Sequence, residues 1–208
     1  MRAQIILCLF MALSATAWAQ SANEALLTRV ASQLDQHAVV RAEFVQSKQV
    51  AALKRPLVTS GHLLFSRQHG VLWQIEHPYR VSYILGEDRV VEIAADGSRK
   101  ERLARDLPGL AQVGRVFRAM LGANTSALRN HFDLQIQGEP QRWVLTLKPQ
   151  QAQIAQFIEQ LEIRGGAFVS EIHVQEAAGD STHIKLRNSA GGAGLTEQEQ
   201  KLFSGSGS

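Results

Sequence analysis

GHLLFSR at residues 61–67 and VLWQIEHP at residues 71–78 are the two stretches that decide the fold of this 208-residue chain. In the first stretch, Leu63, Phe65 and Arg67 fall on one face of an extended segment, and the residues between them fall on the other. The second stretch alternates in the same way and ends at a proline, which has no backbone N–H to donate and so closes a strand. The two stretches therefore predict neighbouring strands of an antiparallel sheet.

The period of two continues on both sides of this pair. Upstream, Val40, Ala42 and Phe44 share one face; downstream, the turns Gly86-Glu87-Asp88 and Asp96-Gly97 are typical of hairpins. About ten to eleven strands are expected, and the first group of them forms a meander that continues to about Leu103. The clearest strand segments are residues 40–48, 61–67, 71–77, 81–85, 89–94, 132–136, 143–149, 157–164, 168–176 and 182–187.

Two segments change to a helical period of about 3.6 residues. Residues 24–36 place Leu27, Val30 and Leu34 on one side, which predicts an amphipathic helix before the first strand. Residues 108–121 carry a second apolar stripe, which predicts another amphipathic helix, and Gly122 is well placed to end it. The stripe consists of Leu110, Val113, Phe117 and Met120. Short helices are also expected over residues 126–131 and after Thr196, where Glu199 completes a capping-box pattern. The fold class is α+β.

The first nineteen residues are typical of a cleaved signal peptide. Arg2 provides the positive start, an apolar run follows, and Ala17-Trp18-Ala19 is a small-x-small cleavage pattern. The alternative, a buried N-terminal helix, fits the abrupt change to polar residues at Gln20 less well. Cleavage after Ala19 would remove Cys8, the only cysteine. We expect a periplasmic protein with one domain over residues 20–203 and a flexible Gly/Ser tail over residues 204–208.

Composition narrows the function classes. The 22 basic and 19 acidic residues give a net charge of +3, which is too small to indicate nucleic-acid binding. The seven histidines lack the spacing of a zinc site, and the chain contains no nucleophile elbow, Walker loop or dinucleotide fingerprint. No metal site, cofactor or catalytic residue is predicted, so we do not expect an enzyme.

A long antiparallel meander curls and leaves a concave face to be filled. Aromatic residues make up only 6% of this chain, so large side chains do not obviously fill that face. Periodicity leaves two alternatives open: the helix over residues 108–121 packs permanently into the concavity, or it covers a site for an apolar ligand.

The ordered motifs resemble the periplasmic outer-membrane lipoprotein carriers called LolA. The resemblance is carried by AEFVQ at residues 42–46, GHLLFSR at 61–67, LWQIEHP at 72–78, WVLTLKP at 143–149 and GDST at 179–182. Each motif is weak alone, but together they follow the family's order over nearly all of the chain after Ala19. Gln68 follows Arg67 where the family usually has proline, which is typical of a divergent branch.

The resemblance implies an incomplete (half) β-barrel whose concave apolar face is covered by helices. It also implies cargo, the acyl chains of a lipoprotein or a related lipid, and two membrane partners: an inner-membrane ABC-type releasing transporter and an outer-membrane acceptor. A monomer is expected. The alternative function is an envelope sensor or scaffold that uses the same fold to bind a lipid or a protein.

Two kinds of site residue follow from the resemblance. Arg67 matches the arginine that fastens the covering helices, although a charge at the rim in water is the simpler alternative. The cavity and its cover are expected to be aliphatic and aromatic, with Trp73 equally consistent with an ordinary core residue. The expected residues are Phe44, Leu63, Phe65, Trp73, Ile75, Val81, Tyr83, Leu110, Val113, Phe117 and Met120.

Overall fold

The computed structural model describes residues 23–107, 114, 116, 118–119 and 125–204. The predicted signal peptide lies outside these described residues. The same is true of the four predicted cover residues Leu110, Val113, Phe117 and Met120.

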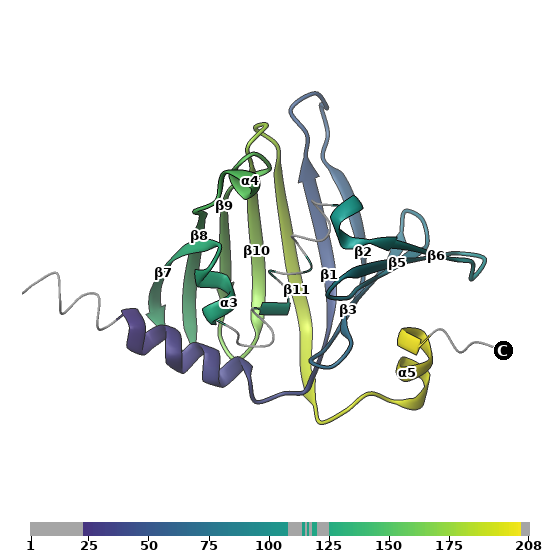
Figure 1. Ribbon diagram of the computed structural model, residues 1–208, viewed down its shortest axis with the longest axis horizontal. Helices are drawn as coiled ribbons and strands as arrows, with labels where there is room; N and C mark the ends of the chain where they lie inside the picture. Colours follow the sequence, from purple (N-terminus) through teal and green to yellow (C-terminus); the bar gives the residue numbers. More distant parts are fainter. Residues whose placement is uncertain (1–22, 108–113, 115, 117, 120–124, 205–208) are drawn as a thin grey trace, which may run out of the picture.

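Within the described residues, one antiparallel sheet contains eleven strands in the order β6-β5-β4-β3-β2-β1-β11-β10-β9-β8-β7 (Figure 1). The strands are β1 (Val39–Gln49), β2 (Leu57–Ser66), β3 (Gly70–His77), β4 (Val81–Leu85), β5 (Arg89–Ala94), β6 (Arg99–Leu103), β7 (Phe132–Glu139), β8 (Arg142–Pro149), β9 (Ile158–Gly165), β10 (Val169–Glu176) and β11 (Ser181–Gly192). β6 and β7 are the two edges and do not pair with each other, so the sheet curls without closing. The predicted half-barrel is confirmed.

The largest difference from prediction is the length of β11, which was expected to end at Arg187. It continues through a Gly-Gly pair because β1 pairs with it as far as Val39 opposite Gly192. A register shift between Arg41 and Glu43 accommodates the irregular sequence. Backbone pairing with a long neighbour thus overrides the weak strand preference of glycine.

Helices lie at both ends of the chain and in two connections. Residues 23–34 are helical, as predicted. The others are the 3₁₀ turn η1 (Ala104–Asp106), α3 (Thr125–Arg129), α4 (Ala152–Ala155), which was not predicted, and α5 (Glu197–Ser204), which includes one residue of the expected tail. The capping box is present: the Thr196 N–H donates to Glu199 Oε2 at 2.7 Å, and the Glu199 N–H donates to Thr196 Oγ1 at 3.3 Å.

The main apolar core lies on the concave face of the sheet. It joins inward side chains from strands in both halves to Leu27, Val30 and Leu34 of the N-terminal helix. Val116 and Ala119, from the segment predicted as the second long helix, belong to the same cluster. Full burial of each aliphatic side chain of this kind contributes about 1.5–3 kcal/mol to folding. Helices therefore cover the concave face, as expected.

A second, smaller core lies on the convex face. Val39, Leu64, Leu72 and Ile84 are buried there, and Phe203 from the C-terminal end of the chain packs against them. The centre of β2 and β3 is consequently buried on both faces, which explains why apolar residues follow one another in the sequence without strict alternation.

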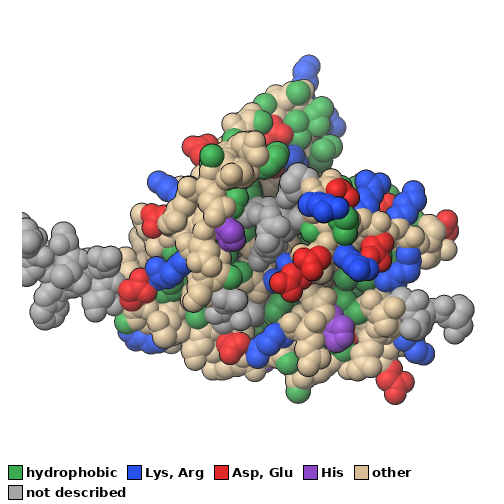
Figure 2. Space-filling model, in the orientation of Figure 1, with side chains coloured by type: hydrophobic (Ala, Val, Ile, Leu, Met, Phe, Trp, Pro, Cys, Tyr) green, Lys and Arg blue, Asp and Glu red, His purple; other side chains and the backbone are tan. Residues whose placement is uncertain are grey.

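The connection between β1 and β2, residues 50–56, projects from one end of the sheet (Figure 1). Apolar and basic side chains gather at this projecting end (Figure 2). We call this end of the sheet the hairpin end; it also holds the β3–β4 and β10–β11 connections.

Candidate functional site

A band of large apolar side chains crosses the concave face of β1 to β4. Strand register places Leu63 opposite Trp73, and Trp73 opposite Tyr83, so these residues share one face. The rings of Phe44 and Trp73 stack with their centroids 3.9 Å apart. Phe44, Leu63 and Phe65 expose 1–2% of their surface, and Trp73 exposes 8%. The predicted wall residues are thus brought together by the sheet.

Burial of this band decreases toward the hairpin end. Ile75 lies opposite Val81 in the last pair of β3 and β4, and both side chains are only partly buried. Tyr83 is also partly buried, and burial together with the charge of Glu92 raises the pKa of its hydroxyl. Ile75, Val81 and Tyr83 therefore stand where the covered face becomes more accessible.

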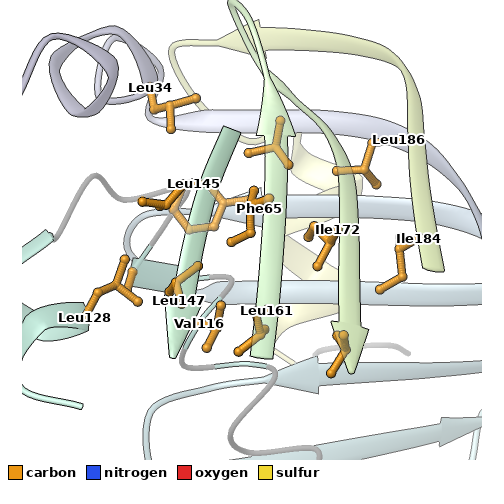
Figure 3. Packing of buried hydrophobic residues seen from close by; sticks show 14 of the residues in the cluster. Leu34, Phe65, Val116, Leu128, Leu145, Leu147, Leu161, Ile172, Ile184 and Leu186 are labelled. Atoms are coloured by element: carbon orange, nitrogen blue, oxygen red, sulfur yellow. The ribbon is translucent and has the colours of Figure 1, made fainter. Parts of the chain in front are cut away.

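Aliphatic residues from β8 to β11 form the other half of the concave face. Leu145, Leu147, Leu161, Ile172 and Ile184 project from successive strands into the same cluster (Figure 3). These residues were predicted to lie on strands but were not assigned to the site. The signal was available, because each alternates with less buried neighbours on its own strand.

The N-terminal helix is fastened over this second half. Gln33 Nε2 donates to the Pro140 carbonyl at 3.2 Å and also to the Gly166 carbonyl. These two bonds join the N-terminal helix to the β7–β8 and β9–β10 turns. Arg129 Nη2 pairs with Glu24 at 2.7 Å. These contacts are polar and lie at the edge of the apolar cluster, so they orient the helix and leave its apolar side to the sheet.

The described part of the middle segment lies against β4. Residues 114, 116, 118 and 119 are helical, and Val116 exposes only 3% of its surface. Arg118 Nη1 donates to the Leu85 carbonyl at 3.3 Å. A Cβ atom at Gly114 would lie 3.0 Å from that of Leu85, so the backbone of this segment approaches β4 closely. The predicted apolar stripe itself lies outside the described residues.

Arg67 lies just beyond the end of β2, and not within the strand as its alternating pattern indicated. Its Nη2 donates to the Asp35 carbonyl at 2.6 Å and lies 2.7 Å from Asp35 Oδ1, immediately after the N-terminal helix. The side chain is 44% exposed, so it stands at the rim. Arg67 therefore contacts a backbone carbonyl just after the N-terminal helix, at the rim of the sheet, and its latch function stays a prediction.

A small polar cluster interrupts the concave face near the hairpin end. Lys48 lies opposite Thr182 in the β1–β11 ladder, and Lys48 Nζ pairs with Glu176 at 2.9 Å. Thr182 Oγ1 donates to the same carboxylate at 3.1 Å. These groups satisfy one another, so the cluster marks the polar limit of the apolar face.

The outer face carries two polar pockets. One, of about 290 Å³, is lined by His62, Glu76 and Arg187 among others, and one of about 210 Å³ by His173 and His183 among others. His62 and Glu76 pair at 3.5 Å, and His183 and Glu171 at 3.3 Å. Among the described residues, no three histidine, cysteine or acidic side chains are arranged to hold a metal ion. Within the same residues, no helix has the length and apolar character needed to cross a membrane.

An open antiparallel half-barrel with a helix-covered apolar concave face defines a LolA-type fold. Residues 19–203 match the family described as outer membrane lipoprotein carrier protein LolA-like. The chain belongs to this family. No functionally curated protein matches it.

Solved structures similar to this one include two bacterial proteins that match over most of their length. A LolA superfamily protein, NE2245 from Nitrosomonas europaea, has a TM-score of 0.49 at 9% identity, over 87% of this chain and 96% of the other. A putative outer membrane lipoprotein-sorting protein domain from Vibrio parahaemolyticus has a TM-score of 0.47 at 9% identity, over 87% and 99%. The complex of MucA and MucB from Pseudomonas aeruginosa gives 0.46 at 15% identity, over 84% and 59%.

Proposed function

We propose that the concave face binds the acyl chains of a lipoprotein, or of a related lipid, and shields them during passage from the inner to the outer membrane. The continuous apolar band from Phe44 through Leu63 and Trp73 carries this proposal, because it leads from a buried interior to partly exposed residues at one end. Membership of the LolA-like family supports it. The proposed role is binding and transfer without covalent chemistry.

The energetics favour a carrier that hands cargo over directly. An acyl chain of about fifteen methylenes gains roughly 12 kcal/mol if all of them are buried, at about 0.8 kcal/mol per CH₂. Release into water from such a site would be very slow. A carrier must therefore bind a donor and an acceptor in turn, and its affinity for the cargo must lie between theirs.

The covering helices would reduce the affinity of the concave face for cargo. Leu27 and Val30 of the N-terminal helix, and Val116 of the middle segment, are themselves buried against the concave face. Closing the empty site therefore buries apolar surface, and this contribution opposes cargo entry. Binding is then weaker than the burial of an acyl chain alone would give.

The direct test begins with protein purified from expressing cells and extracted with organic solvent. We expect co-purified acyl lipid in the extract, and saturable binding of a fluorescent fatty acid by the delipidated protein. Unlabelled long-chain fatty acid should displace the probe. An empty extract together with no binding of the probe would refute the proposal.

The carrier and sensor functions differ in their partners. A carrier contacts both an inner-membrane ABC-type transporter and an outer-membrane acceptor, whereas a sensor passes its signal to one partner. Crosslinking in living cells, followed by identification of the linked proteins, separates them. Transfer of labelled lipoprotein from inner-membrane to outer-membrane vesicles by the purified protein would support the carrier function.

A further inference from the structure

The β1–β2 connection differs chemically from the other hairpins of the sheet. Residues 50–58 read VAALKRPLV, which contains seven apolar residues, two basic residues and no acid. Most other hairpin turns in the described residues contain glycine, including Gly86 and Gly166, and Gly97 and Gly179 at positive φ. Solvent-exposed turns normally use Gly, Pro, Asn, Asp and Ser, and of these residue types only Pro56 occurs in residues 50–58. The composition of residues 50–58 therefore calls for an explanation beyond turn geometry.

The apolar side chains at the end of β1–β2 are exposed, both in the connection and on the first two residues of β2. Leu53 exposes 43% of its surface, and Leu57 and Val58 expose 53% each. The neighbouring β3–β4 connection adds Tyr79, which is 58% exposed, next to Arg80. Register places His77 opposite Ser60, so the β3–β4 connection begins level with Ser60, and residues 50–58 project beyond it. Figure 2 shows the apolar side chains together with Lys and Arg at this projecting tip.

The backbone of the hairpin is held in place. The Ala51 N–H donates to Asp180 Oδ1 at 3.0 Å, and the Leu53 N–H donates to the Val50 carbonyl at 2.9 Å. Lys48, just before the turn, pairs with Glu176. The nearby acidic groups are thus engaged by the base of the hairpin, and the positive charges of Lys54 and Arg55 stay at its tip.

We propose that residues 50–58 and Tyr79 form a docking surface for an anionic lipid bilayer. Leucine, valine and proline side chains would enter the interfacial region, and Tyr79 would lie at its boundary, where an aromatic ring with a polar tip is favoured. Lys54, Arg55 and Arg80 would contact lipid phosphates, since cations near an anionic membrane surface are attracted to it. The surface is too small to anchor the protein, so docking is reversible.

Docking at this end gives the fold an orientation. Ile75, Val81 and Tyr83, the least covered residues of the concave band, lie toward the same end of the sheet. A protein standing on its β1–β2 connection would therefore turn the accessible end of its concave face toward the lipid. Membrane docking is inferred from residues 50–58 and Tyr79 alone. Only its use in cargo transfer rests on the proposed function.

The test is sedimentation of the purified protein with vesicles. We expect binding to an equimolar mixture of phosphatidylcholine and phosphatidylglycerol, weaker binding to phosphatidylcholine alone, and loss of binding as salt is raised. Each basic residue near an anionic surface contributes about a fivefold increase in affinity, so Lys54→Glu with Arg55→Glu should weaken binding by more than about twentyfold. Leu53→Asn should weaken it on both kinds of vesicle.

Two matched variants control for charge and hydrophobicity. Arg142→Glu with Lys185→Glu makes the same charge change at exposed positions away from the hairpin, and Leu103→Asn changes a leucine that is 39% exposed on β6. Both should bind vesicles like the unaltered protein. Binding of a fluorescent fatty acid in solution should be unchanged in all four variants, which separates docking from cargo binding.

Two results would overturn the docking surface. One is the absence of vesicle binding by the unaltered protein, which would leave a protein partner as the occupant of the hairpin end. The other is equal weakening by the hairpin variants and their controls, which would indicate a non-specific response to charge or polarity.

Discussion

Arg41 on β1 and Glu199 on α5 form a two-bond ion pair on the convex side of the sheet. Arg41 Nε and Nη2 donate to the two carboxylate oxygens at 2.7 and 2.6 Å. Arg41 Nη2 also donates to the Gly194 carbonyl at 3.1 Å. Because Glu199 is also part of the capping box, one carboxylate both starts α5 and fixes it to the sheet.

The first prediction concerns the pH dependence of this attachment. The hydrogen bond from Arg41 lowers the pKa of Glu199 to about 2, from an ordinary value of 4.5. A carboxyl with a depressed folded-state pKa stabilises the fold above its unfolded pKa, and that stability is lost as pH falls from about 4.5 toward 2. The protection factors of the α5 amides, which are corrected for the intrinsic pH dependence of exchange, should therefore fall over this window.

Glu199→Gln should remove this dependence. The variant retains an oxygen acceptor but has no charge for Arg41, so we expect a loss of about 2–4 °C in thermal midpoint at neutral pH, for a change of about 1 kcal/mol. The difference between the two proteins should vanish near pH 2. Glu197→Gln on the same helix is the control and should show no comparable change. A pH-independent difference between Glu199→Gln and the unaltered protein would contradict the assignment.

The second prediction concerns Trp143 on β8, which is fully buried. Its Nε1 donates to the Gly166 carbonyl at 3.0 Å, and a Cβ atom at Gly165 would meet the indole ring at 2.5 Å. Trp143→Phe removes the hydrogen bond and leaves a cavity, so unfolding in urea should show a loss of about 1–4 kcal/mol. Because Gly166 also accepts from Gln33 of the N-terminal helix, exchange in residues 23–34 should rise. A fully stable variant would show that this tryptophan is not a structural anchor.

Much of the fold was predictable because inward residues recur with a period of two. Val81 and Tyr83 were assigned to the concave face, and register places them opposite Ile75 and Trp73 on that face. The convex core was not predicted: Leu64 was placed on the face opposite Leu63 and Phe65, and neither Leu64 nor Leu72 was assigned to a second core. Nothing in the local pattern of β2 and β3 shows that Phe203, more than a hundred residues later, covers them.

The same distinction holds for the candidate site. Phe44, Leu63 and Trp73 were predicted because alternation fixes which face a residue joins. Arg67 was expected to extend the inward face of its strand, but β2 ends one residue earlier. Where a strand ends depends on hydrogen bonds to its neighbours: β2 pairs as far as Ser66 opposite Gly70, and the Arg67 N–H instead bonds to the Ala38 carbonyl. Such long-range pairing is not encoded in a short segment.

The third prediction treats Arg67 as a latch on the N-terminal helix. Arg67→Leu removes the bonds to Asp35 and His37, and because the pair is half-exposed the cost in stability should stay below about 1 kcal/mol. We expect intact folding, faster exchange in residues 23–34 and impaired transfer of cargo to acceptor membranes. Arg164→Leu breaks a comparably exposed pair with Glu162 on the outer face and should leave transfer unchanged. Equal transfer by Arg67→Leu and the unaltered protein would remove Arg67 from the site.

The fourth prediction compares two isoleucines on opposite faces of the sheet. Ile75 on β3 packs against the concave core, and Ile93 on β5 packs against the convex core; both are partly buried. Substitution of either by asparagine should cost a similar amount of stability, since each loses comparable apolar contact. Only Ile75→Asn should weaken binding of a fluorescent fatty acid, by about tenfold for a loss of about 1.4 kcal/mol. If both variants lost binding in proportion to their stability, or if Ile93→Asn alone lost it, the ligand would not occupy the concave face.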